Sequence, residues 1–505
     1  MIEAGTEVGV LDGSVGHDGG ERVARVRADG GIAAVTYAQL ATLVDETAQR
    51  LRAAGVVSGT DGIARIGLAA PNGIAHVVLA LAVLRAGGCV VPVAGELAPP
   101  ERRALLRALH PRAVLVAAGA RWDETADAAT ISTLEVAGTP VRIVATPGGE
   151  AQARSPFDEG RLAALDPAFI RFSSGTTGTS KGVILSHRTL VERIAAANRG
   201  LGIAPDDRIL WLMPMAHHFA ASIMLYLAQR ATTVLLGAHL ATDVLTAARR
   251  HAATVFYAAP FHYALLAAER SRETWPSLRL AVSTAAALPV ATAQAFDARF
   301  GVPVAQALGI IEVGLVAVND EPREKPASVG RPLPDFTAEL RGDDGRPVPA
   351  GGVGELFVRG PGMLDGYLWP FRPRAEILAG GWFGSGDLAT ADHDGSLRLV
   401  GRARSVINVS GMKCFPEEIE AVLQEHPSVA AVRVVGRAHE RVGAVPVADI
   451  VPRDPARPPA PRALAAHCRA ALARFKVPVE FRMVPALPLT ASGKLKRDPD
   501  QQSGG

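Results

Sequence analysis

The chain has 505 residues, of which 48% are hydrophobic and 20% are charged, and its 53 basic and 50 acidic side chains leave a formal charge of +3. This composition is that of an ordinary globular chain with about three domains or subdomains. A charge so close to neutral argues against nucleic acid or an anionic membrane as the main partner.

The three cysteines, Cys89, Cys414 and Cys468, lie far apart and lack CxxC spacing. This usage argues against a disulfide framework or a zinc finger and predicts a cytoplasmic protein. The N-terminal segment has neither the basic nor the apolar region of a secretory signal. The most apolar stretch, 74–93, contains charged residues and a Gly-Gly pair, and it predicts a buried helix and strand, with no membrane span.

The first elements alternate between helix and strand. Residues 1–35 form a loose leader that can accommodate a hairpin, and the alternation begins after it. Short apolar strands alternating with helices predict a parallel sheet covered on both faces. The predicted helices are 37–54, 73–85 and 100–109, and the predicted strands are 65–70, 89–93 and 113–117.

The alternation pauses over 118–165, which is rich in Ala, Gly and Pro and to which we assign no element, and then resumes. The units that follow are too many for one small domain, so we expect two stacked doubly wound α/β subdomains. The predicted strands are 169–172, 183–185, 208–213, 233–236, 254–258, 278–282 and 302–305, and the predicted helices are 187–198, 216–229, 241–250, 261–267 and 291–300.

Beyond Gly309 the pattern changes twice. Residues 327–400 are rich in Gly, Pro and β-branched residues and predict a β-rich subdomain, with strands at 354–359 and 396–400. We therefore expect an N-terminal domain over 1–402 and a small mobile α+β domain over 403–505. In the latter, strands are predicted at 406–409, 429–435, 446–451 and 480–484, and helices at 416–424 and 460–474.

The segment between two of the predicted strands, 173–182, holds three glycines, six hydroxyl side chains and Lys181. Converging backbone N–H groups, hydroxyls and one ammonium suit a polyphosphate. A nucleotide triphosphatase P-loop would need G-x-x-x-x-G-K-[ST], but Gly178 stands three positions before the lysine, so that interpretation fails. The loop predicts a nucleotide site of a different class.

Phe172-Ser-Ser-Gly-Thr-Thr-Gly-Thr-Ser-Lys-Gly-Val183 resembles the signature of the adenylate-forming superfamily, which includes acyl- and aryl-CoA synthetases, amino-acid adenylation domains and luciferases. Further motifs match in order, and the resemblance covers about residues 36–497. It implies ATP-dependent activation of a carboxylic acid as acyl-AMP with release of pyrophosphate. Transfer to a thiol would follow, either of coenzyme A or of phosphopantetheine on a separate carrier protein.

The resemblance also assigns residues to the nucleotide. Ser283-Thr-Ala-Ala-Ala-Leu-Pro289 resembles the turn on which adenine lies, Gly384-Ser-Gly-Asp387 the ribose-binding segment, and Leu308-Gly-Ile-Ile-Glu312 the segment whose glutamate binds Mg²⁺. The nucleotide residues are Ser173, Ser174, Gly175, Thr176, Thr177, Gly178, Thr179, Lys181, Thr284, Ala285, Ala286, Leu308, Gly309, Ile310, Ile311, Asp387 and Arg402, with Glu312 and Thr177 as metal ligands.

Two residues depart from the family pattern. Leu308 stands where relatives carry the aromatic residue that stacks on adenine, and Ile311 stands where they carry a threonine that contacts the α-phosphate. Because of these departures, it stays open whether the chain is a nucleotide-binding homologue with altered catalysis or an enzyme that only forms adenylates. A further alternative is a luciferase-like oxygenase.

Pro214-Met-Ala-His-His-Phe219 resembles the acyl-pocket segment of acyl- and aryl-activating members, whose histidine, here His217, lies between the acid and the thiol tunnel. Amino-acid-activating members have an aspartate where this chain has His218. We therefore expect a bulky aryl, alicyclic or fatty acid. The expected acyl-pocket residues are His217, His218, Phe219, Tyr257, Ala259, Phe261, Ser283, Gly309, Val313 and Gly314.

The expected C-terminal domain resembles the mobile cap of the family. Lys494, in Leu487-Pro-Leu-Thr-Ala-Ser-Gly-Lys-Leu-Lys-Arg497, matches the catalytic lysine of adenylation. Arg404, two residues after the Gly-Arg arginine, stands at the hinge position, and Gly411 stands where the chain approaches the thiol acceptor. The resemblance thus implies that the cap rotates between the two half-reactions.

Overall fold

The computed structural model describes residues 23–28, 31–57, 62–97, 99–122, 130–145, 158–172, 181–237, 240–409, 412–439, 443–488 and Leu495. These residues form two compact units. Unit 1 holds the described residues before Ser173, together with Lys181–Phe336 and Arg359–Gly381. Unit 2 holds Thr337–Val358 and the described residues from Trp382 onward.

The first sheet of unit 1 has nine strands in the order β20-β19-β9-β8-β4-β3-β5-β7-β6, with a parallel centre and antiparallel edges. Its central strands are buried along their whole length, as in a sheet covered on both faces. The strands are β3 (Arg65–Ala69), β4 (Cys89–Pro92), β5 (Ala113–Ala117), β6 (Thr130–Val136), β7 (Thr139–Ala145), β8 (Pro167–Phe172), β9 (Gly182–Ser186), β19 (Gly366–Tyr367) and β20 (Arg372–Pro373).

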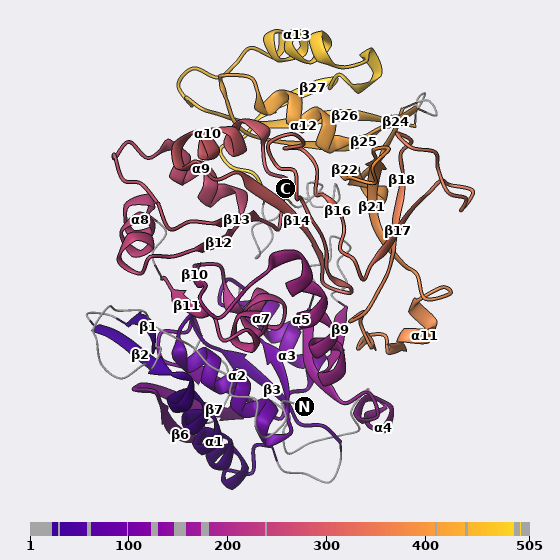
Figure 1. Ribbon diagram of the computed structural model, residues 1–505. Helices are drawn as coiled ribbons and strands as arrows, with labels where there is room; N and C mark the ends of the chain where they lie inside the picture. Colours follow the sequence, from indigo (N-terminus) through magenta and orange to yellow (C-terminus); the bar gives the residue numbers. More distant parts are fainter. Residues whose placement is uncertain are drawn as a thin grey trace. The chain divides into compact units, whose positions relative to one another are not determined.

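The second sheet of unit 1 also has nine strands, in the order β16-β15-β14-β13-β12-β10-β11-β1-β2. Its five central strands, from β14 to β11, run parallel, and the N-terminal hairpin extends the edge at β11 (Figure 1). The strands are β1 (Val23–Ala28), β2 (Gly31–Thr36), β10 (Arg208–Trp211), β11 (Thr232–Leu235), β12 (Val255–Ala258), β13 (Leu280–Ser283), β14 (Val304–Ile310), β15 (Gly314–Val318) and β16 (Arg331–Pro332).

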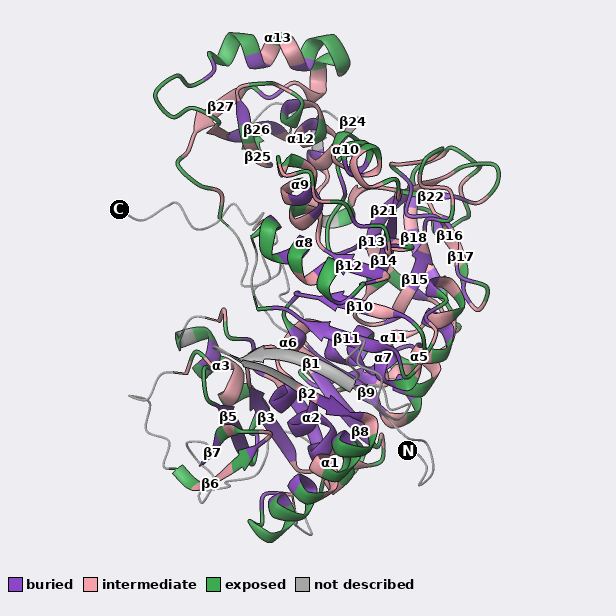
Figure 2. Ribbon diagram, turned by 60° about the vertical axis from the view of Figure 1, so that its left-hand side comes forward, coloured by how far each residue is buried: buried purple, intermediate pink, exposed green. Residues whose placement is uncertain are grey.

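The helices of unit 1 pack on these sheets with their apolar faces inward, as Figure 2 shows by burial. Helix α2 is buried on nearly every side, because it packs on β3, β4 and β5 and is covered in turn by α1. Helix α5 contacts β9 of the first sheet and β15 of the second. The longer helices are α1 (Tyr37–Ala53), α2 (Ile74–Ala86), α3 (Pro99–Leu109), α5 (His187–Leu201), α8 (Ala241–Arg250), α9 (Pro260–Ala268) and α10 (Val290–Phe300).

One predicted helix, 216–229, is interrupted in the structure. It consists of α6 (Met215–His218), a π-helical turn η1 (Phe219–Ile223) and α7 (Met224–Ala228). Wide turns of this kind are rare and often mark functional sites. The interruption falls directly after His217 and His218, two of the expected acyl-pocket residues.

Unit 2 contains two sheets. The first is antiparallel, in the order β17-β18-β21-β22, and the second has the order β24-β23-β26-β25 with β27 beside β26. Helices α12 (Pro416–Gln424) and α13 (Pro461–Ala471) share a hydrophobic core with the second sheet. The strands are β17 (Thr337–Arg341), β18 (Gly354–Arg359), β21 (Phe383–Ala391), β22 (Leu397–Arg402), β23 (Ile407–Val409), β24 (Met412–Cys414), β25 (Val429–His439), β26 (Gly443–Pro452) and β27 (Glu480–Met483).

Two sequence expectations need correction. The weakly patterned segment 118–165 contains the hairpin β6–β7 and the short helix α4 (Glu159–Ala163). The expected β-rich stretch 327–400 does not form one sheet, because β16 joins the second sheet of unit 1 and β19 and β20 join the first. The second correction arises from pairing between residues distant in sequence, which local pattern does not reveal.

The expected fold class is confirmed: two mixed α/β sheets, a smaller β-sheet, and an α+β C-terminal part. Among the described residues, no helix combines the length and apolar character that crossing a membrane requires. The boundary at 402/403 and the hinge at Arg404 stay predictions.

Candidate active site

Four loops of unit 1 lie at the same edge of the second sheet. They follow β10, β12, β13 and β14, which are neighbouring parallel strands and therefore end at a common edge. Ligands of α/β sheets bind outside the carboxyl ends of such strands. These loops carry His217, Ala259, Thr284 and Glu312, so the fold brings four of the expected site segments to one place.

Lys181 and Glu312 meet the same tyrosine, Tyr367 on β19. The Lys181 Nζ lies 4.8 Å from the centre of the Tyr367 ring. The Tyr367 hydroxyl donates a hydrogen bond to Glu312 Oε1 at 3.1 Å. Burial raises the pKa of Tyr367, which keeps the phenol protonated and able to donate. The lysine of the phosphate loop and the expected metal ligand thus both contact Tyr367. Sequence reasoning missed this tyrosine.

The backbone around Glu312 is fixed by Arg193, a buried arginine of α5. Its guanidinium donates to the Ile311 carbonyl at 2.9 Å and to the Gly362 carbonyl at 2.5 Å. Burial lowers the pKa of Arg193 to about 9. Gly362 has φ +65°, and a Cβ there would lie 2.5 Å from Arg193 Cγ, so this position requires glycine.

Glu312 is the described carboxylate best placed to hold a metal ion. The Leu364 N–H donates to its carbonyl at 2.6 Å, and its side chain is half-buried with the Tyr367 bond described above. Among the residues that the structure describes, no three His, Cys, Asp or Glu side chains gather as a metal site. An ion at Glu312 would therefore need further oxygen ligands from phosphates and water, as Mg²⁺ commonly takes.

An aromatic wall joins the loops after β10, β12 and β13. The Trp211 ring stacks on Tyr257 at 6.1 Å and meets His218 edge-on at 5.5 Å. Tyr257 in turn hydrogen-bonds the Thr284 side chain, and burial raises the pKa of its hydroxyl. Tyr257 and His218 were expected at the acyl pocket. Trp211 is 0% exposed, so it is a core residue that supports Tyr257 and His218 from behind, and sequence alone does not reveal that contact.

Two other expected pocket residues lie elsewhere. Phe219 is 1% exposed and stacks on His76 and Phe169, so its ring packs in the interior beside α2 and the first sheet. Phe261 is 65% exposed on α9, and its ring contact is with His262. The structure does not bring either ring onto the wall formed by Trp211 and Tyr257.

The turns expected beside adenine have unusual local geometry. Ala285 has φ +74°, a left-handed conformation that alanine adopts at a cost of about 1 kcal/mol. Ser283 is buried, and its hydroxyl makes no hydrogen bond with the described residues. Ala285 and Ala286 are exposed, whereas Leu308 is buried in β14, at an irregularity of the β14–β15 register. Expected residues Gly309, Ile310, Val313 and Gly314 follow on this strand and its turn.

In unit 2, Asp387 and Arg402 form an ion pair across neighbouring strands. They are directly paired between β21 and β22, and Arg402 Nε lies 2.7 Å from Asp387 Oδ1. The Asp387 side chain is 9% exposed and the Arg402 side chain is 55% exposed. The two residues expected near the ribose are therefore neighbours.

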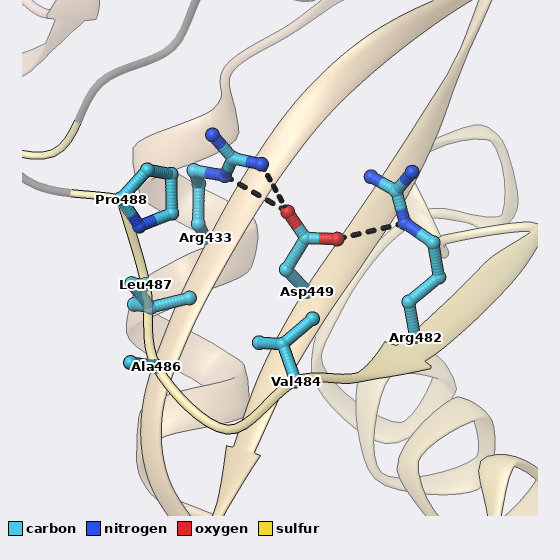
Figure 3. A pocket seen from close by; sticks show the side chains of 7 residues that line it. All are labelled: Arg433, Asp449, Arg482, Val484, Ala486, Leu487 and Pro488. Carbon is cyan, nitrogen blue, oxygen red and sulfur yellow. Dashed lines mark hydrogen bonds and ion pairs between the residues drawn. The ribbon is translucent and has the colours of Figure 1, made fainter. Parts of the chain in front are cut away.

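A second charged cluster of unit 2 lines a cavity of about 330 Å³ (Figure 3). Asp449 on β26 accepts hydrogen bonds from Arg433 through one oxygen, and Arg482 Nε lies 2.7 Å from its other oxygen. The cavity is lined on one side by Val484 and the segment Ala486–Pro488. Sequence reasoning missed this cluster, because its members are far apart in the chain.

Some expected residues lie outside the described part of the chain: Ser173, Ser174, Gly175, Thr176, Thr177, Gly178, Thr179, Gly411 and Lys494. The backbone of Arg404 is described, in the short 3₁₀ turn Ala403–Ser405, but its side chain is not.

An α/β core with nucleotide-type loops at one sheet edge, continued by an α+β part, defines an adenylate-forming enzyme. The family model "AMP-binding enzyme" matches residues 14–368, and "AMP-binding enzyme C-terminal domain" matches residues 418–494. The chain therefore belongs to the AMP-binding enzyme family.

Individual relatives agree. The chain is 31% identical over 477 residues to a sulfoacetate–CoA ligase of Cupriavidus necator, covering 92% of this chain and 91% of the relative. It is 33% identical over 473 residues to a feruloyl-CoA synthase of an Amycolatopsis species, covering 92% of each. The o-succinylbenzoate-CoA synthetase of Bacillus subtilis, solved with its acyl-adenylate intermediate, superposes with a TM-score of 0.79 at 25% identity, covering 96% of each chain.

The protein is an acid–thiol ligase. It activates a carboxylic acid with ATP as acyl-AMP, releases pyrophosphate, and transfers the acyl group to a thiol. This confirms the prediction made from the motifs.

Proposed function

We propose that the protein makes coenzyme A thioesters of bulky aryl or alicyclic acids at the sheet edge of unit 1. The observation that carries this proposal is the arrangement of Lys181, Tyr367 and Glu312, in which an ammonium lies against the ring of one tyrosine and a carboxylate accepts from its hydroxyl. A cation and a metal-binding carboxylate held close together suit a polyphosphate whose charge must be balanced during attack on it.

In the first half-reaction, the carboxylate of the acid attacks the α-phosphate of ATP in line, and pyrophosphate leaves. Lys181, with the hydroxyls and N–H groups of 173–179, binds the phosphates. Glu312 would hold Mg²⁺, which supplies positive charge against the phosphate oxygens. Lys494 is the ammonium that stabilises charge between carboxylate and phosphate in the transition state.

Asp387 is the ribose residue of this proposal. A carboxylate can accept two hydrogen bonds from a vicinal diol, and the ion pair with Arg402 orients this carboxylate. Arg404 is the hinge about which the C-terminal domain turns. Lys494 acts before this turn, in adenylation, and the segment of Gly411 acts after it, in the second half-reaction.

The substrate class follows from the aromatic wall. Trp211 and Tyr257 are 0% and 7% exposed, so they form an apolar backing behind the half-buried His218, and alanines such as Ala259 leave room beside it. His218 occupies the position of the ammonium-binding aspartate and packs edge-on against Trp211. An α-amino acid would therefore lack its counter-charge there.

A screen of pyrophosphate release tests this proposal. The purified protein is supplied with ATP, Mg²⁺ and coenzyme A, and with ferulate, indole-3-acetate, cyclohexanecarboxylate, sulfoacetate, palmitate or phenylalanine. We expect an aryl or alicyclic acid to give the highest kcat/KM and a thioester product. The substrate proposal is wrong if phenylalanine or sulfoacetate exceeds all of the aryl and alicyclic acids.

A further inference from the structure

Helix α6 is held from the other sheet of unit 1. The Asn72 side chain, which follows β3, donates to the Met213 carbonyl at 2.9 Å and accepts from the Met215 N–H at 2.8 Å. Glu96, which follows β4, forms a short hydrogen bond with His217 Nε2. Both ends of this single turn are therefore fixed by residues at the carboxyl edge of the first sheet, and His217 is oriented by a carboxylate.

The charge of Glu96 determines the tautomer of His217. Burial alone would raise the pKa of Glu96, but the hydrogen bond from His217 and the charge of Arg121 hold the pKa below its ordinary value. An ionised carboxylate only accepts hydrogen bonds, so Nε2 carries the proton. The lone pair of the neutral ring is then on Nδ1, which makes no hydrogen bond with any residue in the described part of unit 1.

The exposure of the pair argues against a purely structural role. The side chains of His217 and Glu96 are 27% and 28% exposed. Ion pairs with this much access to water contribute little to stability. An imidazole anchored through one nitrogen by a carboxylate, with its other nitrogen open, is the arrangement by which enzymes activate a nucleophile.

We propose that Glu96 is a positioning residue that makes His217 the general base of the second half-reaction. This inference rests on the proposed function. As the thiol sulfur bonds to the acyl carbon, its proton passes to His217 Nδ1. The bond from that carbon to the phosphate oxygen breaks, and AMP leaves with the electron pair. The imidazolium, stabilised by Glu96, then returns its proton to water.

The groups around the pair bear on its pH dependence. Arg121 is the cation that acts on Glu96. His218 lies on the same turn and contacts Trp211, while His76 of α2 stacks on the neighbouring Phe219. Burial lowers the pKa of His76 to about 4, so it stays neutral and adds no charge near neutral pH.

Single-turnover kinetics of Glu96→Gln test the proposal, with ferulate as the acid and coenzyme A as the thiol, or with whichever acid of the screen is fastest. Two rates are followed: the burst of pyrophosphate and the formation of thioester from the enzyme-bound adenylate. We expect thioester formation to fall on the order of 10²-fold relative to the pyrophosphate burst. We also expect the pH profile of thioester formation, scanned between about pH 6 and 9, to differ between the variant and the wild type.

Three controls separate a base from a structural support. Asp45→Asn removes an exposed ion pair with Arg85 in the same unit and should change neither rate. Hydroxylamine, a neutral nucleophile that reacts without a base, should trap the adenylate equally fast in wild type and Glu96→Gln. Added imidazole should restore thioester formation to His217→Ala.

The inference is overturned if Glu96→Gln forms thioester at the wild-type rate, or if pyrophosphate release, thioester formation and hydroxylamine trapping all fall together. Failure of the proposed function would look different: the wild-type protein itself would show no pyrophosphate burst with any acid.

Discussion

Tyr367 contacts both of the charged residues that the motifs single out in unit 1. Its ring lies against Lys181 and its hydroxyl donates to Glu312, although it stands 55 residues beyond Glu312 in sequence. The contact exists because the short strand β19 pairs with β9, which places Tyr367 opposite Val183. No local pattern marks this tyrosine, so its role emerges only from the folded sheet.

Replacing Tyr367 separates its two contacts. Tyr367→Phe keeps the ring against Lys181 but removes the donor to Glu312. Because a hydrogen bond to a charged group contributes about 1.5–3 kcal/mol, we expect the first-turnover pyrophosphate rate to fall about tenfold or more at limiting Mg²⁺. Tyr367→Ala should cost more, since it also removes the ring. An unchanged Mg²⁺ dependence in Tyr367→Phe would show that the hydroxyl does not position Glu312.

At the scale of elements, periodicity predicts most of unit 1 and misses specific parts. Helices such as α8 and α12 have the bounds that their apolar spacing predicts. The predicted helix over 216–229 instead contains a π turn, and side chains that follow strands of another sheet, Asn72 and Glu96, hold the short helix before it. Patterns within one segment carry no information about such distant partners.

The candidate site is likewise divided between residues that motifs locate and residues that they miss. Motifs located the loops at the sheet edge and the Asp387–Arg402 pair, because each motif is continuous in sequence. They missed Tyr367, Trp211 and Glu96, whose contacts depend on strand order and helix packing. Continuous motifs therefore locate the expected site segments, whereas contacts between distant segments emerge only from the fold.

Helix α5 supports the site through Arg193, and its removal should be felt in both stability and catalysis. Arg193→Met leaves the Ile311 and Gly362 carbonyls without their buried donor. We expect a loss of about 2 kcal/mol, since the cost of two unsatisfied carbonyls is partly offset by removing a buried charge. Thermal melting measures the loss of stability, and the KM for ATP measures the effect on the site.

Arg188→Met is the matched control on the same helix. Arg188 is 88% exposed and pairs with Glu192 one turn away, so its replacement should leave the melting temperature unchanged. Equal effects of the two substitutions would contradict the role assigned to Arg193.

The cluster around Asp449 should stabilise the second sheet of unit 2. Asp449→Asn removes the negative charge that lies against both Arg433 and Arg482 (Figure 3). Breaking a buried pair costs about 3–5 kcal/mol, and we expect about 2 because Arg482 is 38% exposed and therefore screened. Hydrogen exchange of the amides of β26 measures this local loss.

The exposed pair of Arg437 and Glu480 offers a control in the same sheet. Glu480→Gln should leave exchange in β26 nearly unchanged. If Asp449→Asn exchanges no faster than Glu480→Gln, the cluster does not hold the sheet together.

At the scale of the whole molecule, the proposal assigns groups of both units to the two half-reactions. The groups assigned to unit 1 are Lys181, Glu312, His217 and Glu96. They lie in segments next to strands of its two nine-stranded sheets. The groups assigned to unit 2, Asp387, Arg402 and Lys494, come from its sheets and its C-terminal segment. Adenylation should therefore need both units, whereas acyl transfer should not need Lys494.

The most direct test of this account is exchange of labelled pyrophosphate into ATP, measured with and without the acid that the screen selects. The account predicts exchange that depends on the acid in the wild-type protein and falls by about 10²-fold or more in Lys494→Ala. In the same variant, thioester formation from a supplied acyl-adenylate should persist. Exchange at the wild-type rate in Lys494→Ala, or exchange that needs no acid, would contradict the account.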